Sequence, residues 1–258
     1  MGWHSKGGHD RTFGTNAKAW DWCSVNNAGF EYYQNAKKDG IGLPPHNPRI
    51  WVFRHQSNAS CAPMLRRVWH PIGYSSNSGW SNFFINITAG RLLTYTNTLL
   101  KFALPDIVIG TGGGYNTYDI YESVNHELSH ASHFNKVGSA FWAKYVNYII
   151  TYGKKYDHPY GDASCNNSGF CGVGEMWGYA MGYIRTYEKY QQKPKNGQSK
   201  WFQPNLLYDL MTEKILTKKQ IFDCLSSDVT SHALLKQKMI SRYPSKKDSI
   251  IAKFSRYG

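Results

Sequence analysis

The chain has 258 residues, of which 41% are hydrophobic and 16% aromatic, and its formal net charge is +13. This length and apolar content suit one sizeable hydrophobic core. No run of 18 apolar residues occurs, which excludes a membrane-spanning helix of ordinary length. We therefore expect residues 1–258 to form a single domain.

The N-terminal region, residues 1–48, is rich in glycine, asparagine and aromatic residues, and a helix is expected over 28–38, ended by Gly40. Met1 is followed by ordinary sequence without the apolar segment of a signal peptide. We interpret this region as an N-terminal extension or as the remnant of a truncated longer chain. The next expected elements are a strand over 50–53, a helix over 61–68, a polar loop over 73–82 and a helix over 92–102.

A second strand is expected over 106–110, directly before a glycine-rich loop over 110–115. The loop begins like a dinucleotide-binding fingerprint, but Tyr115 replaces its final glycine and no acidic partner follows. We therefore interpret it as a mobile loop or tight turn. Asn116, Thr117 and Asp119 are candidate N-terminal caps for a helix that starts after it.

That helix carries the most informative motif of the chain, His126-Glu127-Leu128-Ser129-His130. With ten His and six Glu in the chain, the pattern would arise by chance about 0.01 times. At 100° per residue the two imidazoles lie about 40° apart, while Ile120, Val124, Leu128 and Ala131 form a separate apolar face. Two imidazoles one turn apart beside a carboxylate are typical of a hydrolytic zinc site.

The motif resembles that of the zincin metallopeptidases. The metzincin branch requires a glycine three residues after the second histidine and a third histidine three residues later, where this chain has His133 and Lys136. The chain therefore does not fit that branch. His133 shares the stripe of His126 but lies about 10 Å along the helix axis from it, which is too far for a common tetrahedral ion. We interpret it as a packed, pocket-lining or neighbouring residue.

Downstream, Gly174, Gly178 and Gly182 recur every four residues and predict a groove that another helix can approach closely. Glu175, which we expect to open this second helix, lies 49 residues after His126. The arrangement is similar to that of the gluzincins, in which such a Glu is the third zinc ligand. Glu175 could instead simply favour a helix N-terminus. We favour the ligand, because a carboxylate among Gly, Trp and Met needs a partner.

The alternative third ligand is Asp157, in a segment similar to the Asp-x-x-Tyr-Gly pattern of the aspzincins but without its preceding Gly-Thr. The same segment could be an ordinary turn with Asp, Pro and Gly. Four residues are candidates for the pocket or for stabilising an oxyanion: His158, Tyr160, Tyr179 and Tyr183.

The resemblance, which covers residues 106–190, implies an α+β zincin-like catalytic domain with a small N-terminal sheet and a predominantly helical C-terminal half. It also makes the strand over 50–53 or over 106–110 a candidate for pairing with extended substrate. The expected function is zinc-dependent hydrolysis of peptide bonds, with Zn²⁺ activating a water and Glu127 as general base. The alternatives are a module that retains zinc without turnover and a zinc hydrolase of a non-peptide amide.

Between the helix of the motif and the helix of Glu175, an apolar helix is expected over 139–151. A loop follows it, in which Cys165 and Cys171 could close a disulfide. With five cysteines in total, at least one thiol has no partner within the chain. The loop disulfide favours an exported protein.

The C-terminal 74 residues hold 15 Lys or Arg against six Asp or Glu. These charges alternate with apolar residues at helical spacing and predict two or three amphipathic helices with solvated basic faces. No motif typical of nucleic-acid recognition is present, so we expect a peptide or protein substrate and no nucleic acid as the partner. The sequence does not indicate an oligomeric state.

Overall fold

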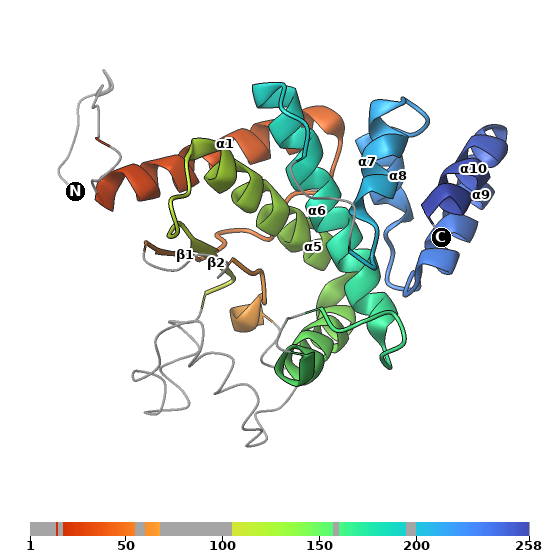
Figure 1. Ribbon diagram of the computed structural model, residues 1–258, viewed down its shortest axis with the longest axis horizontal. Coiled ribbons are helices and arrows are strands. Elements are labelled where there is room, and N and C mark those ends of the chain that lie inside the picture. The colour runs from red at the N-terminus through yellow and green to blue at the C-terminus, as the bar shows by residue number, and fades with distance from the viewer. Residues whose placement is uncertain are drawn as a thin grey trace.

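The computed structural model describes residue 14 and residues 18–54, 60–67, 105–156, 160–194 and 200–257. It is mostly helical, with one two-stranded parallel sheet, which agrees with an α+β class (Figure 1). The elements are α1 (Lys18–Asp39), β1 (Ile50–Phe53), β2 (Ile107–Gly110), α5 (Thr117–Tyr156), α6 (Ser168–Tyr190), α7 (Pro204–Thr212), α8 (Lys218–Cys224), α9 (His232–Arg242), the 3-10 turn η1 (Pro244–Lys246) and α10 (Lys247–Tyr257).

Helix α1 begins ten residues before the expected start at residue 28. Its buried side chains include Val25, Ala28, Tyr32 and Ala36, whose spacing of three or four residues forms one apolar stripe. The stripe packs on α5, where the hydroxyl of Tyr32 lies 2.7 Å from that of Ser132. Helix α1 therefore covers the face of α5 that the sequence predicts to be apolar.

The two strands form where the sequence places them, and they pair in parallel with Ile50 opposite Ile107. All four residues of β2 are buried. The expected helix over 61–68 is wrong at its start, because the backbone N–H and C=O of Cys61 both pair with Val108 and hold the chain extended. Only residues 65–67 of that stretch are helical among those that the structure describes.

Helix α5 starts with a cap that the sequence anticipates, since the side-chain oxygen of Asn116 accepts hydrogen bonds from the backbone N–H groups of Tyr118 and Asp119. The four residues of its predicted apolar face are at most 1% exposed. At Gly138 the backbone leaves the helical region, with φ 82°, and the chain bends before the apolar segment that the sequence predicts from residue 139. The motif therefore lies in the straight first half of α5.

Helix α6 packs against α5 through Gly174, Gly178 and Gly182, which form a glycine stripe along α6. A Cβ atom added at Gly174 would lie 3.2 Å from the ring of Tyr145, and one at Gly182 would lie 3.2 Å from the carbonyl oxygen of Glu122. The predicted close approach of two helices is thus present. The helix begins at Ser168, so Glu175 sits in its interior rather than at its first turn, which corrects the expected position.

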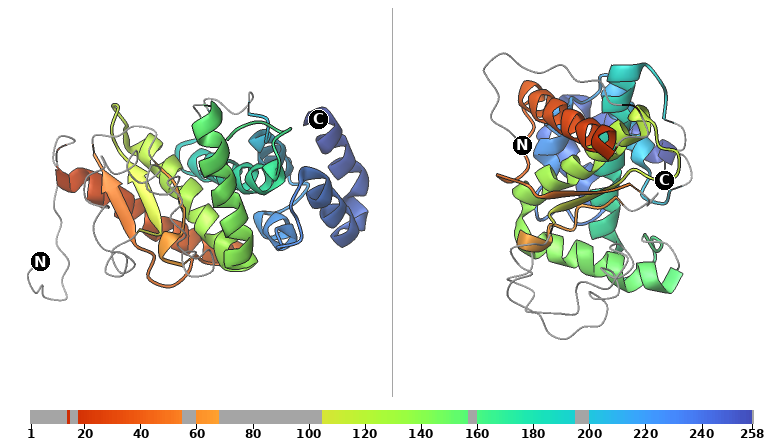
Figure 2. Two further views of the ribbon diagram at one scale, coloured as in Figure 1. Left: turned by 90° about the horizontal axis from the view of Figure 1, so that it is seen from below. Right: turned by 90° about the vertical axis from the view of Figure 1, so that its left-hand side faces the viewer.

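The C-terminal segment forms α7 to α10, more helices than the expected two or three. Several of its basic side chains pair with carboxylates, for example Lys219 with Asp223 and Lys238 with Asp228. Figure 2 shows the two strands at one end of the molecule and α9 and α10 at the other. No helix in the described part of the chain combines the length and apolar character needed to cross a membrane.

None of the five cysteines, all of which lie in the described residues, forms a disulfide. Cys171 is fully buried in the first turn of α6, and Cys165 is buried in the loop before that helix. The disulfide that their spacing allows is therefore not formed in this structure. The exported location that we inferred from it stays a prediction.

Candidate metal centre

The two motif histidines face each other across one turn of α5. Their Nε2 atoms are 2.9 Å apart, and the exposed fractions of His126 and His130 are 8% and 1%. In a neutral imidazole only one ring nitrogen carries a proton. Two Nε2 atoms at this distance therefore either share one proton or direct two lone pairs at a common cation.

Glu175 reaches the same point from α6. Its carboxylate oxygens lie 3.5 Å from Nε2 of His126 and 3.6 Å from Nε2 of His130. One oxygen, Oε1, accepts a hydrogen bond from the hydroxyl of Tyr145, whereas Oε2 is buried without a hydrogen-bond partner. Because a buried carboxylate oxygen without a partner is costly, this atom indicates a missing positive ligand.

The charge states of the cluster follow from burial and proximity. Burial lowers the pKa of His126 to about 4, so its imidazole is neutral at neutral pH. Burial acts to raise the pKa of Glu175, but the two neighbouring imidazoles outweigh it and hold that pKa well below its usual range. A neutral imidazole and an ionised carboxylate are the forms that bind a metal ion.

Gly178 makes room for this cluster. A Cβ atom at its position would lie 2.7 Å from both Cε1 and Nε2 of His130, and 3.2 Å from Cε1 of His126. The imidazoles thus rest against the bare backbone of α6. The middle glycine of the stripe provides the space in which the two histidines and Glu175 meet.

Glu127 is the second carboxylate of the centre. His126, Glu127 and His130 offer ligand atoms that all lie within 4.8 Å of one another and could hold a metal ion. Oε1 of Glu127 is 3.8 Å from Nε2 of His126, farther than either oxygen of Glu175 is from its imidazole. Burial, and then the charge of Glu175, raise the pKa of Glu127 well above its usual range.

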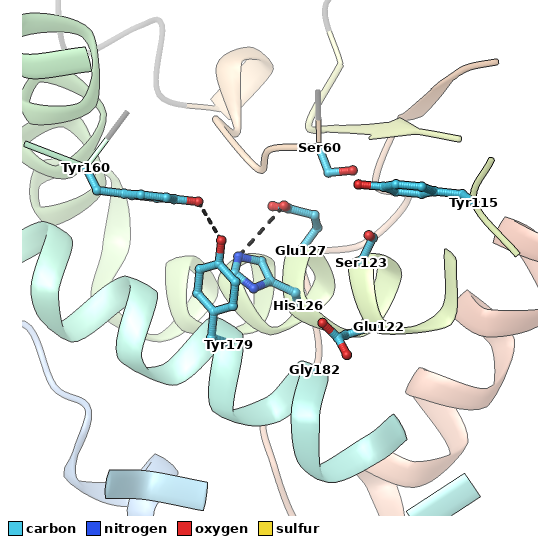
Figure 3. Close-up of a pocket in the computed structure, with 9 residues that line it drawn as sticks. All are labelled: Ser60, Tyr115, Glu122, Ser123, His126, Glu127, Tyr160, Tyr179 and Gly182. Atoms are coloured by element: carbon cyan, nitrogen blue, oxygen red, sulfur yellow. Dashed lines mark hydrogen bonds and ion pairs between the residues drawn. The ribbon is translucent and has the colours of Figure 1, made fainter. Parts of the chain in front are cut away.

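A pocket of about 330 Å³ opens in front of His126 and Glu127 (Figure 3). Tyr160 and Tyr179, two of the predicted oxyanion candidates, line it, and their hydroxyl oxygens are 2.9 Å apart. Burial raises the pKa of both phenols, so both stay protonated at neutral pH. The ring of Tyr179 also packs edge-on against His126, at 4.3 Å between centroids.

The other candidates lie elsewhere. Tyr183 packs against Tyr179 and Tyr208 and is not among the residues that line the pocket. His133 is fully buried against the rings of Phe141 and Trp142, and neither of its ring nitrogens has a hydrogen-bond partner. It is thus a packed histidine. The alternative third ligand, Asp157, and the pocket candidate His158 both lie outside the described residues.

The structure adds residues to this region that the sequence did not single out. Glu122 lines the pocket one helical turn before His126, and the same phase that aligns the histidines would have placed it there. Tyr145, which supports Glu175, and Ser60, which lines the pocket beside β2, have no sequence signal. Lys200 also has no sequence signal. Its ammonium lies 3.4 Å from the centroid of the Tyr179 ring.

Comparisons of the chain with protein-family models, with curated proteins and with solved structures give no match. The resemblance to the zincins therefore depends on the motif and on the geometry of the site.

Proposed function

We propose that the protein is a zinc-dependent metallopeptidase in which His126, His130 and Glu175 hold the metal and Glu127 is the general base. One observation carries this proposal. Two facing imidazoles and a buried carboxylate oxygen without a hydrogen-bond partner converge beside a second buried carboxylate, and one imidazole, His126, and that second carboxylate, Glu127, line a pocket. The motif alone does not specify such an arrangement.

The distances suit the ion. Zinc binds imidazole nitrogen and carboxylate oxygen at about 2.0–2.2 Å, so neighbouring ligand atoms of a tetrahedral site lie about 3.3 Å apart. In this cluster the two Nε2 atoms are 2.9 Å apart, Oε2 of Glu175 lies 3.5 Å from Nε2 of His126, and Oε1 lies 3.6 Å from Nε2 of His130. We favour Glu175 over Glu127 as the third ligand, because its two oxygens span both imidazoles whereas the closest approach of Glu127 to His126 is 3.8 Å.

A bound zinc ion supplies the Lewis acid that polarises a carbonyl group and makes a water molecule acidic near neutral pH. The remaining roles fall to side chains of the chain. Glu127 faces the pocket and takes the proton of the attacking water, then passes it to the leaving amine. Burial raises the pKa of Glu127, which makes its carboxylate a stronger base.

We assign the stabilisation of the oxyanion to Tyr160 and Tyr179. Their hydrogen bond uses one of the two phenol protons and leaves the other free to be donated. Because both hydroxyls line the pocket, that proton can reach the oxygen of a polarised carbonyl group. Tyr145 has a different role, since it orients Glu175 from behind.

Two variants test the proposal. Glu127→Gln keeps the shape of the side chain but cannot accept the proton, so we expect peptide hydrolysis to fall at least about 100-fold while zinc content is unchanged. Glu175→Gln should instead weaken zinc binding, measured by titration of the chelator-treated protein. Glu213→Gln, at the end of α7, is the matched control, because its carboxylate pairs with Lys253 away from the pocket.

Zinc-edge anomalous scattering from crystals identifies the metal and its third ligand together. Hydrolysis by Glu127→Gln at the wild-type rate would refute the mechanism. Zinc bound by a wild-type protein that cleaves no peptide would favour the zinc-retaining module or a hydrolase of another amide.

A further inference from the structure

A short segment before α7, residues 200–202, holds the two phenols of the pocket. The indole N–H of Trp201 donates a hydrogen bond to the backbone carbonyl of Tyr160, at 3.1 Å. The ring of Phe202, which is 1% exposed, lies 5.2 Å from the ring of Tyr160 and stacks on that of Tyr179 at 5.5 Å between centroids. The segment therefore fixes both phenols at once, and the proposed chemistry does not yet use it.

Lys200 is the charged residue of this segment, and its ammonium lies among aromatic rings. The nitrogen is 3.4 Å from the centroid of the Tyr179 ring. It is 5.3 Å from the centroid of the Tyr160 ring and 5.6 Å from that of Phe202. A cation within about 6 Å of a ring centroid is attracted by the face of the ring. Of the three rings, that of Tyr179 therefore feels the charge most strongly.

The ammonium of Lys200 is charged at neutral pH, although the side chain is half-buried. Burial lowers its pKa to about 8, and the carboxylates of Glu175 and Glu122 oppose this shift. Attraction to these two carboxylates keeps the ammonium beside the pocket, and the ring of Tyr179 is the surface on which it rests. Lys200 is therefore a cation that already has its partners, next to the phenol pair.

A cation at the face of a phenol ring changes the properties of its hydroxyl group. It draws electron density from the oxygen into the ring, so the hydroxyl becomes a better donor and a poorer acceptor. The hydroxyl oxygens of Tyr160 and Tyr179 are 2.9 Å apart, and either can be the donor (Figure 3). Because Lys200 lies closer to the ring of Tyr179, it favours Tyr179 as the donor. The proton of Tyr160 is then free, and the hydrogen bond that Tyr160 accepts makes it a stronger donor in turn.

We propose that Lys200 is a positioning residue that acts through the ring of Tyr179 and directs the phenol pair, so that Tyr160 donates its proton to the oxyanion. The inference rests on the proposed peptidase function and adds a residue to it. Lys200 is not among the residues that line the pocket, so it acts through Tyr179 rather than on the substrate itself. Because the charge on the substrate oxygen develops in the transition state, the effect belongs to kcat and not to KM.

A second route from Lys200 to the reaction has to be separated from this one. The same ammonium attracts Glu175 and Glu122, so its removal also changes the charge balance around the metal centre. Tyr179→Phe distinguishes the two routes, because it keeps the ring on which the ammonium rests and removes only the hydroxyl. An effect of Lys200 that needs this hydroxyl passes through the phenol pair, and an effect that does not need it passes through the carboxylates.

The test measures kcat and KM of the zinc-loaded protein on a peptide that a random library shows to be cleaved. Lys200→Met removes the charge and keeps an unbranched side chain, and we expect kcat to fall about ten-fold at unchanged KM and zinc content. Lys200→Arg keeps a cation that stacks on rings and should retain kcat within about three-fold. In Tyr179→Phe, adding Lys200→Met should change kcat by less than about two-fold. Lys236→Met is the matched control, because its ammonium lies over another ring, that of Phe254 at 5.9 Å, and should keep the wild-type kcat.

An unchanged kcat in Lys200→Met, or a loss confined to KM or to zinc content, would overturn the inference and leave the peptidase proposal intact. A ten-fold loss that persists in Tyr179→Phe would overturn it as well, because Lys200 would then act on the carboxylates. If no peptide is cleaved, the peptidase proposal fails, and calorimetric binding of a phosphinic alanine dipeptide, which carries an anionic oxygen on tetrahedral phosphorus, decides the inference. Binding that weakens in Lys200→Met but not in Lys236→Met supports it, and equal or absent binding overturns it.

Discussion

Replacing Gly178 by alanine should disturb the metal centre more than the fold, and the size of the effect can be worked out from the structure. Gly178 lies inside α6, where alanine is favoured over glycine by about 1 kcal/mol. The new Cβ would lie 2.7 Å from two atoms of His130, closer than real Cβ atoms approach their neighbours. The imidazole cannot easily move away, because Trp142 and Tyr145 pack around it. Overpacking of this kind costs about 1–3 kcal/mol.

Gly29 provides a matched control. It lies inside α1, and a Cβ there would lie 3.9 Å from Leu128, an ordinary contact. Gly29→Ala should therefore gain the full helix preference of about 1 kcal/mol. The two variants should differ in free energy of unfolding by the cost of the clash alone, about 1–3 kcal/mol, with Gly178→Ala the less stable.

Urea unfolding in the presence of a chelator measures this difference without the metal. Calorimetric titration with zinc then measures affinity, which we expect to fall at least about ten-fold in Gly178→Ala, as when a supporting group of a metal site is altered. Gly29→Ala should bind zinc like the wild-type protein. Equal stabilisation by both substitutions, together with unchanged zinc affinity, would refute the proposed packing of His130 on α6.

Two further predictions concern titration and catalysis. Burial lowers the pKa of His133 to about 3 from about 6.5 in the unfolded chain, so between these values only the unfolded state binds its proton. The stability that the neutral side chain contributes is therefore complete above pH 6.5 and lost as the pH falls. Relative to His133→Phe, the metal-free wild-type protein should lose up to about 1.4 kcal/mol per pH unit in urea unfolding, and parallel pH profiles would contradict this. Tyr160→Phe should lower kcat by about 100-fold with little change in KM, and a raised KM at unchanged kcat would assign Tyr160 to substrate binding instead.

The sequence predicted the features of the site that depend on a single helix. The separation of His126 and His130, and the apolar face of α5 that begins at Ile120, follow from 3.6 residues per turn whatever surrounds the helix. The same rule would have placed Glu122 near the histidines. The glycine stripe also predicted a close approach of two helices, because small side chains at four-residue spacing leave a groove on any helix.

The position of Glu175 within α6 could not be predicted in this way. From the sequence we expected Glu175 to open a helix, although Gly174 and Gly178 lie inside the helix in the structure. In the fold, the glycines are tolerated inside α6 because α5 fills the space beside them. The extended segment at Cys61 differs from the expected helix for a similar reason, since pairing with Val108 in the sheet outweighs local preference.

By itself the sequence determined the candidate metal-binding motif and its phase on the helix, since these depend on spacing along one element, and it named the residues that could complete the site. Only the tertiary structure decided which of them meet. It brings Glu175 to the imidazoles, supports it with Tyr145, and assembles the acidic pocket from Ser60, Glu122 and Tyr160. These residues are distant in the chain, and their convergence comes from the packing of α5 on α6 and on the sheet, which no local pattern encodes.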